Sequence, residues 1–378
     1  MNHAAHRNPF QPFELERYQN KWENRVSYNL AESGVQPLTF GELLAVTGTD
    51  PGEIADLQLG YGQTDGSNAL KEMIAGLYPG AGPENVLVTV GSSEANFVTS
   101  WSLVSAGMRV AIQTPTYKQT WGLAQNLGAQ VAGFALDGDR SWTLDHASAE
   151  AAITPDTDVV VVTNPNNPTG HIMTGPERET VIGLTRRAGA WLLVDEVYRG
   201  AEREADRSDT FWGTGDRVVV VGGLSKAYGL PGLRIGWVVG PDPFISEVAA
   251  RHDYTVIGAS SLSDFLAVRA LRTADVLLDR ARGIIHSHFE TLEQWLSRHA
   301  DMFSWTPPEC GAICFPRYNM DVESFEFVER LRKVHSVLLV PGSHFDCASH
   351  LRIGFGYDRS SLQAALTRVS EAITTLAA

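Results

Sequence analysis

The chain has 378 residues, a formal net charge of −14, and a composition of 43% hydrophobic and 20% charged residues. Such a length predicts more than one small core and therefore two domains. The acidic balance argues against general nucleic-acid binding, which needs a basic surface. Because the sequence lacks a run of about eighteen apolar residues, we expect no membrane-spanning helix.

The N-terminal segment and the cysteines indicate the cellular compartment. The first 25 residues contain no apolar stretch, so we do not expect a secretory signal. The three cysteines, Cys310, Cys314 and Cys347, are scattered and odd in number. They predict neither a disulfide framework nor a metal site, and they favour a reducing, cytoplasmic location.

Short runs rich in valine and isoleucine predict buried strands in the first two thirds of the chain. They begin at Asn85, Arg109, Gln130, Asp158, Ala190 and Asp216. Each run is continuous rather than alternating, which is typical of strands covered on both faces. Helical periodicity lies between them, at 94–105, 119–127 and 176–188. This alternation predicts an α/β sandwich with a mostly parallel central sheet.

The pattern changes after about residue 253. Long helical patterns cover 262–295, 324–333 and 360–376, with short apolar segments between them. These features predict a smaller α+β domain. We therefore divide the chain into an N-terminal arm at 1–45 that packs on the small domain, a large domain at 46–260 and a small domain at 261–378.

Polar residues follow five of the predicted strands directly. The five polar segments begin at Gly91, Thr114, Asn164, Asp195 and Gly222. In open α/β sheets, ligands bind outside the carboxyl ends of the strands. The sequence therefore predicts that these segments converge on one binding crevice.

Two of these segments have both a plain and a functional interpretation. Ser92 and Ser93 open a predicted helix, where free backbone N–H groups seat a phosphate, although a simple serine N-cap explains them equally. Asn167 lies in a double-proline turn at 164–170, which turn chemistry alone explains. The same turn would also hold Asn167 as a rigid hydrogen-bond donor.

The remaining segments point to covalent chemistry. Asp195 ends an apolar strand, and a buried carboxylate needs a partner: an arginine, a helix N-terminus or a protonated ring nitrogen. Tyr198 would reach the same ligand. Lys226 is either a solvated loop lysine or, in a desolvated pocket, a Schiff-base lysine. Arg234 would clamp a phosphate. Together, these groups describe a pyridoxal phosphate site.

The segments NPNNPTG, DEVY and LSKAYGLPGLRIGW occur in that order at intervals of roughly thirty residues. They resemble the class I/II aminotransferases, which are fold-type-I pyridoxal phosphate enzymes. The resemblance extends from about Leu57 to Phe355. It implies a three-layer, aspartate-aminotransferase-like large domain at 46–260 that binds the cofactor, and a smaller α+β domain.

The resemblance also implies individual roles. Lys226 would form the Schiff base with pyridoxal phosphate, and Asp195 would pair with the pyridine nitrogen. Asn167 and Tyr198 would contact the ring hydroxyl oxygen, and Tyr117 would stack on the ring. The residues implied for the phosphate are Ser92, Ser93, Ser225 and Arg234.

Further positions bear on the substrate and the assembly. Arg352 matches the arginine that takes the substrate α-carboxylate, with Asn167 beside it. Tyr61 matches the tyrosine that reaches the phosphate from a neighbouring subunit, which implies a homodimer with shared active sites. Gly34 and its neighbours Glu32 and Ser33 are candidates for substrate contacts, because we expect that segment to cover the site.

Two departures from the family pattern bear on the reaction. Gly223 stands three residues before Lys226, where the family commonly has a phosphate-binding hydroxyl. The segment at 29–44 resembles the branch of capreomycidine synthase and the lincosamide-tailoring enzymes of antibiotic biosynthesis. Relatives of that kind eliminate, cyclise, or couple decarboxylation to oxidative deamination instead of transaminating.

We therefore expect a pyridoxal phosphate-dependent, aminotransferase-like enzyme that acts on a small amino substrate in specialised metabolism. Transamination is favoured, with elimination, cyclisation or oxidative deamination as alternatives. A cofactor-sensing regulator is disfavoured because the fold begins too early for an N-terminal DNA-binding domain. The intact set Lys226, Asp195, Asn167 and Arg352 argues against an inactive scaffold.

Overall fold

A computed structural model describes residues 10–204 and 207–377. Its centre is an eight-stranded sheet in the order β2-β9-β8-β7-β6-β3-β4-β5. The strands are β2 (Val86–Thr89), β3 (Arg109–Thr114), β4 (Gln130–Asp137), β5 (Thr143–Leu144), β6 (Val159–Thr163), β7 (Trp191–Asp195), β8 (Val218–Gly223) and β9 (Gly236–Val239). Strands β4, β3, β6, β7 and β8 run parallel, whereas β9 and β5 are antiparallel to their neighbours. The mostly parallel sheet is confirmed.

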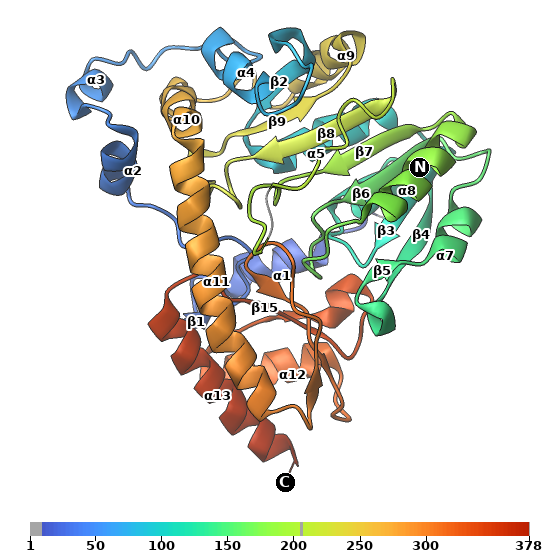
Figure 1. Ribbon diagram of the computed structural model, residues 1–378, viewed down its shortest axis with the longest axis vertical. Helices are drawn as coiled ribbons and strands as arrows, with labels where there is room; N and C mark the ends of the chain where they lie inside the picture. Colours follow the sequence, from blue (N-terminus) through green and yellow to red (C-terminus); the bar gives the residue numbers. More distant parts are fainter. Residues whose placement is uncertain (1–9, 205–206, 378) are drawn as a thin grey trace, which may run out of the picture.

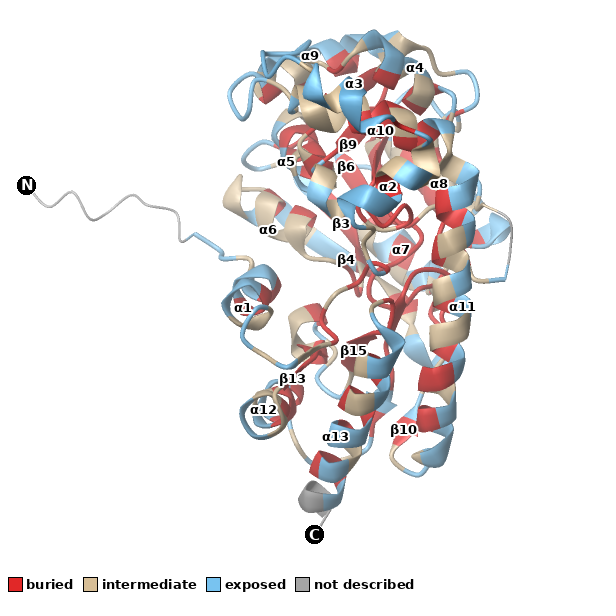
Figure 2. Cartoon of the chain, turned by 90° about the vertical axis from the view of Figure 1, so that its left-hand side faces the viewer, coloured by how far each residue is buried: buried red, intermediate tan, exposed pale blue. Residues whose placement is uncertain are grey.

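Both faces of this sheet are covered, which explains the continuous apolar runs (Figures 1 and 2). In β6, Val159 and Val161 belong to one buried cluster, and Val160 and Val162 belong to the other. The first cluster includes residues of α5 (Gly91–Leu103), α6 (Gln119–Asn126) and α9 (Asp242–His252). The second includes residues of α4 (Asn68–Ala75), α7 (His146–Ala152), α8 (Gly175–Ala188) and α10 (Ser261–Arg272). Alternate side chains of one strand therefore fill two separate cores.

One strand and one helix break differ from the sequence-based expectation. The run that begins at Asp216 is the last of the buried strands expected for this sheet, but β9 follows it and inserts between β2 and β8. A Cβ atom at Gly236 would lie 2.3 Å from the backbone of Ser92, so glycine permits this close approach to α5. The long helical pattern at 262–295 is divided at Thr273 into α10 and α11 (Ala274–Arg298).

The lower half of the molecule in Figure 1 is built around α11 and α13 (Arg359–Ala377). Its strands are short, with β15 (Leu351–Gly354) between β11 (Ile313–Cys314) and β14 (Val340–Pro341), and β10 (Phe303–Ser304) paired with β12 (Arg317–Tyr318). The helix α12 (Ser324–Arg330) lies next to them and continues as a π-helical turn at Leu331–His335. No helix among the described residues combines the length and hydropathy that crossing a bilayer requires.

The N-terminal residues join this lower half in two places. The strand β1 (Tyr28–Asn29) pairs in parallel with β13 (Val337–Leu338). The helix α1 (Glu14–Trp22) is held by the Tyr18 hydroxyl, which donates to Glu329 Oε1 at 3.1 Å. The chain then leaves through α2 (Phe40–Thr47) and α3 (Pro51–Ala55), which lie apart from the sheet at the upper left of Figure 1.

Candidate active site

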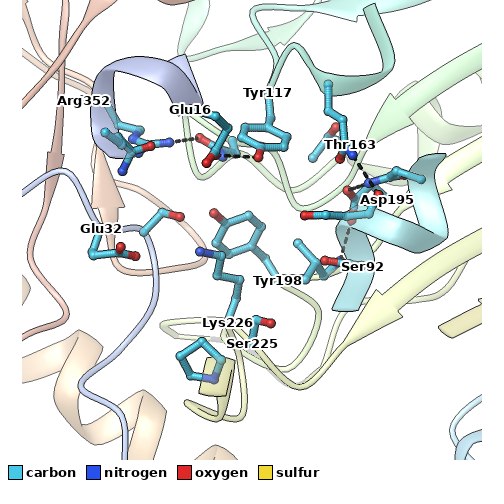
Figure 3. Close-up of a pocket in the computed structure, with 18 of the residues that line it drawn as sticks. Glu16, Glu32, Ser92, Tyr117, Thr163, Asp195, Tyr198, Ser225, Lys226 and Arg352 are labelled. Atoms are coloured by element: carbon cyan, nitrogen blue, oxygen red, sulfur yellow. Dashed lines mark hydrogen bonds between the residues drawn. The ribbon is translucent and has the colours of Figure 1, made fainter. Parts of the chain in front are cut away.

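A pocket of about 270 Å³ opens at the carboxyl ends of β6, β7 and β8 (Figure 3). It brings together ten of the residues that the sequence analysis singled out. They are Ser92, Ser93, Tyr117, Asn167, Asp195, Tyr198, Ser225, Lys226, Arg234 and Arg352. The structure therefore brings the predicted strand ends together at one pocket.

Lys226 reaches the pocket from the turn that follows β8. Its side chain points past Tyr198 into the open space (Figure 3). Within the described part of the chain, its amine makes neither a hydrogen bond nor an ion pair. A lysine with no protein partner, facing a pocket, is available to react with a carbonyl group.

Asp195 ends β7 and is only 7% exposed. Its carboxylate accepts from Asn96 Nδ2 at 2.7 Å and from the Val197 N–H at 3.0 Å. Burial raises the pKa of Asp195, and the two hydrogen bonds and the positive charge of Lys226 act against that shift. The carboxylate is thus fixed in place and faces the pocket.

Asn96 was not anticipated from the sequence. It lies one helical turn after Ser92 on α5, so both residues face the pocket. The available signal was the predicted buried carboxylate, which needed a donor from a neighbouring element.

Four side chains in the lining each carry a buried polar atom without a hydrogen-bond partner among the described residues: Asn96, Gln119, Tyr198 and Arg352. The Tyr198 hydroxyl and Arg352 Nε have no hydrogen-bond partner within the described residues. Tyr198 is 3% exposed and Arg352 is 1% exposed. Because an unpaired buried polar group costs free energy, such atoms mark where a ligand supplies the partner.

Arg352 lies on β15 and is fully buried. Its Nη1 donates to Asn167 Oδ1 at 3.1 Å, and its Nη2 donates to the Ala31 carbonyl at 2.6 Å. No carboxylate of the described chain forms an ion pair with it. Burial lowers the pKa of Arg352, but a guanidinium remains charged in proteins. The charges of Glu32 and Glu16 act on this guanidinium, but without a direct ion pair among the described residues it suits an incoming carboxylate.

The start of α5 forms the candidate phosphate seat. Its N-cap residue is Val90, with no side-chain cap, so the plain serine N-cap interpretation is wrong. Gly91 has φ +78°, and a Cβ atom there would lie 2.5 Å from Arg234 Nη2. The guanidinium of Arg234 therefore packs against Gly91 at the N-terminus of this helix, where a cation and the first N–H groups of the helix suit an anion.

Gly223 faces the same seat. A Cβ atom at this position would lie 3.6 Å from the Ser92 Cβ and only 3.2 Å from the Ile235 carbonyl oxygen. A hydroxyl-bearing side chain would thus point toward the seat, but it would press on the backbone of the turn that carries Arg234. The absence of that hydroxyl matches this tight packing.

The comparisons with known proteins agree with this geometry. A family model described as aminotransferase class I and II matches residues 54–369. The chain belongs to this aminotransferase family. Its cofactor is pyridoxal phosphate, and the unpartnered Tyr198 hydroxyl and free Lys226 amine fit a bound pyridoxal ring.

Two curated relatives are similar over nearly the whole length. Capreomycidine synthase of Streptomyces vinaceus is 33% identical over 358 residues, covering 92% of this chain and 90% of that enzyme. The putative aminotransferase YugH of Bacillus subtilis (strain 168) is 26% identical, covering 93% and 94%.

Solved structures show the same similarity. A PLP-dependent aminotransferase from Streptococcus suis 89-1591 has a TM-score of 0.92 and 31% identity, covering 98% of this chain and 99% of that one. The PLP-dependent cyclase OrfR has a TM-score of 0.89 and 28% identity, with the same coverage. This aminotransferase-family chain is therefore a pyridoxal phosphate-dependent enzyme with the aspartate-aminotransferase-like fold.

Two residues of the sequence-based set lie outside the pocket. Tyr61 is 94% exposed and does not line the pocket of its own chain. Gly34 packs behind Lys226, where a Cβ atom would lie 3.4 Å from the Ser225 carbonyl oxygen and 3.6 Å from Lys226 Cδ. Its neighbours Glu32 and Ser33 do line the pocket.

Two acidic residues that the sequence did not point to, Glu16 and Glu23, join Glu32 in the lining, and we call these three residues the acidic wall. Glu16 and Glu23 come from α1 and its C-terminal cap and share one helix face with Gln19, which also lines the pocket. Burial and then the charges of Glu32 and Glu16 raise the pKa of Glu23. The spacing of 16, 19 and 23 was the available signal.

Glu16 also contacts a second residue of the pocket lining. Its carboxylate accepts from the Tyr117 hydroxyl at 2.6 Å (Figure 3), and the Tyr117 ring packs edge-on against Phe13 at 4.8 Å. The N-terminal helix therefore touches the ring that the sequence analysis assigned to cofactor stacking.

Proposed function

We propose that this enzyme binds pyridoxal phosphate through Lys226 and converts an amino acid that carries a cationic side chain. The observation that carries the proposal is the charge arrangement of one pocket. A buried Arg352 without an ion-pair partner among the described residues lines this pocket, together with the acidic wall of Glu16, Glu23 and Glu32.

The lining residues divide the work as follows. When bound, pyridoxal phosphate supplies an electron sink for the bonds at the amino acid Cα. Lys226 would anchor the cofactor and then, once released, move the proton at Cα. Asp195 would keep the ring nitrogen protonated, and Tyr198 and Asn167 would hold the ring oxygen. The phosphate would lie at Ser92, Ser93, Ser225 and Arg234.

Arg352 would bind the substrate carboxylate in the same pocket. With the carboxylate at Arg352 and the amine at Lys226, the remainder of the amino acid faces the acidic wall. Burial and, after it, the charges of Glu32 and Glu16 raise the pKa of Glu23, so the negative charges there repel one another. A guanidinium or ammonium group would relieve that repulsion, and a neutral or acidic side chain would not.

The relatives support more than one reaction type. We place transamination first, because the family model describes aminotransferases. A second candidate is elimination or cyclisation without a keto acid, favoured by the likeness to capreomycidine synthase and to the cyclase OrfR. Decarboxylation coupled to oxidative deamination stays an alternative. In each case we propose a cytoplasmic enzyme of specialised, antibiotic-type metabolism.

We also propose a homodimer with shared sites. The segment that carries Tyr61 exposes large apolar side chains, with Leu59 86% and Tyr61 94% exposed. It packs beside a second exposed group at Tyr254, since a Cβ atom at Gly258 would lie 3.2 Å from Thr64. An exposed apolar surface of this kind supports association, and Tyr61 would reach the phosphate seat of a second copy.

The first prediction concerns the anchor. Lys226→Ala should abolish turnover and remove the visible absorption band of the bound cofactor, because no other lysine lines the pocket. Absorption spectroscopy of the purified protein with added pyridoxal phosphate measures this. Lys21→Ala, at an exposed position of α1, is the control and should keep both. A yellow, active Lys226→Ala protein would overturn the assignment.

The second prediction concerns the substrate. Glu32→Gln should lower the preference for arginine over its neutral isostere citrulline by roughly tenfold in kcat/KM, because one charged partner is lost. Glu14→Gln, on α1 but outside the pocket, should leave the preference unchanged. If the wild-type enzyme prefers neutral amino acids, or if Glu32→Gln does not change the ratio, the acidic wall does not select the substrate.

The third prediction concerns the reaction. A panel of cationic amino acids should give product only when a keto acid is present, because transamination returns the amino group to an acceptor. Mass spectrometry and oxygen uptake measure the outcome. Product without a keto acid and without oxygen uptake would replace transamination by elimination or cyclisation. Product with oxygen uptake would indicate the oxidative alternative.

The fourth prediction concerns the shared site. Tyr61→Ala and Lys226→Ala proteins should each be impaired, yet mixed dimers should regain activity. In a mixed dimer, one site combines an intact Lys226 with an intact Tyr61 from the other subunit. Differently tagged proteins, co-expressed and purified through both tags, allow the measurement. No recovery in confirmed mixed dimers would show that Tyr61 does not complete a neighbouring site.

A further inference from the structure

His171 lies directly after the turn that carries Asn167 and is 6% exposed. Its Nδ1 is 2.9 Å from Glu309 Oε2, and its Nε2 is 3.2 Å from both carboxylate oxygens of Glu177. Ionised carboxylates only accept hydrogen bonds, so both ring nitrogens must donate. The geometry therefore requires a doubly protonated, positively charged ring.

The surrounding charges favour the same state. Burial alone lowers the pKa of His171, but the hydrogen bonds and charges of Glu177 and Glu309 outweigh it and raise the pKa to about 9. These two carboxylates are the groups in ion-pair contact with the ring, one from the start of α8 and one from the segment before β11. The ring thus links two elements that are far apart in the sequence.

Glu309 belongs to a short segment, 308–311, which we call the brace. The backbone N–H groups of Glu309 and Cys310 both donate to the Gly170 carbonyl, at 3.1 and 3.0 Å. Gly170 has φ +73°, and a Cβ atom there would lie 2.5 Å from Pro308 Cβ. The brace therefore lies directly against the turn at 164–170.

The brace also supports Tyr198. A Cβ atom at Gly311 would lie 3.1 Å from Tyr198 Cδ1, and Cys310 Sγ lies 3.3 Å from the Tyr198 carbonyl oxygen. The Gly311 N–H donates to the Ala201 carbonyl at 2.9 Å. One segment thus backs both Tyr198 and the turn that carries Asn167.

The backbone of His171 closes that turn. The Asn166 N–H donates to the His171 carbonyl at 2.9 Å, and the His171 N–H donates to Thr169 Oγ1 at 3.2 Å. Asn167 lies inside this closed turn, and its Oδ1 accepts from Arg352. A shift of His171 would therefore displace Asn167 and the guanidinium that it contacts.

We propose that His171 is a positioning residue of the active site, whose charged ring joins the Asn167 turn to the brace and so holds Asn167 and Tyr198 in register. The proposal rests on the proposed function for the part that concerns the cofactor ring oxygen. The charged link itself does not depend on any bound cofactor.

The fifth prediction is tested with His171→Gln and Glu309→Gln. Each removes a charge from the link, while Glu309→Gln keeps an acceptor toward the ring. His146→Gln, at an exposed histidine of α7, is the control. Nitrogen NMR of the histidine rings in the cofactor-free protein should show both nitrogens of His171 protonated at pH 7.5.

Stability gives a second readout without cofactor. The pKa of His171 is about 9 in the folded protein and about 6.5 in the unfolded chain. The charged link therefore contributes its full stabilisation of the folded state below the unfolded pKa. That stabilisation is lost as the pH rises through the folded pKa. The Tm gap between wild type and His171→Gln should therefore be widest near pH 6 and close above pH 9, whereas the His146→Gln gap should not change.

The enzyme with bound pyridoxal phosphate allows measurements that a purely structural role of His171 would leave unchanged. In both link variants, the pH midpoint of the cofactor's visible absorption band should shift, and kcat should fall by roughly tenfold or more, because reacting groups are displaced. The shift reports the contacts of Asn167 and Tyr198 with the ring oxygen. The control should match wild type in both measurements.

The possible results test the charged link, the positioning role and the proposed function separately. A neutral His171 at pH 7.5, or a Tm gap independent of pH, overturns the charged link. Folded link variants with an unchanged absorption midpoint and unchanged kcat overturn the positioning role. If Lys226→Ala keeps its absorption band while the cofactor-free results hold, the proposed function fails and the charged link stands.

Discussion

Three separate parts of the chain meet at the buried guanidinium of Arg352. It is supplied by β15 near the C-terminus and bonds to Asn167, in the turn after β6, and to the Ala31 carbonyl, in the N-terminal segment. A charge that is 1% exposed is tolerated only if its hydrogen bonds are largely satisfied. The position of each part therefore depends on the other two, and the pocket lies where they meet.

Several polar groups of the pocket lack a hydrogen-bond or ion-pair partner among the described residues. Arg352 lacks a carboxylate among the described residues, the Tyr198 hydroxyl lacks a partner, and Asp195 is buried beside the half-buried Lys226. Local costs of this kind occur where a ligand completes the network. The large apolar cores on both faces of the sheet offset them, since most strand side chains are fully buried.

Part of the site could be predicted because sheet topology is simple to infer. Continuous apolar runs with polar ends are enough to assign Asn167, Asp195 and Lys226 to one edge of a parallel sheet. Asn96 escaped prediction, because a helical asparagine carries no signal until its partner across the pocket is known. Glu16 and Glu23 escaped because the sequence assigns the N-terminal arm to the small domain without indicating which helix face meets the pocket.

By itself, the sequence determined the order of strands and helices, the polar residues at strand ends and the family to which they belong, since these follow from local periodicity and motif spacing. The tertiary structure decided which distant side chains share a pocket. It alone placed Glu16 and Glu23 in the pocket that Arg352 lines, left Tyr61 outside that pocket, and put His171 between Glu177 and Glu309. Such pairings depend on how separate elements pack, and packing is set by the shape of the whole core rather than by neighbours in the chain.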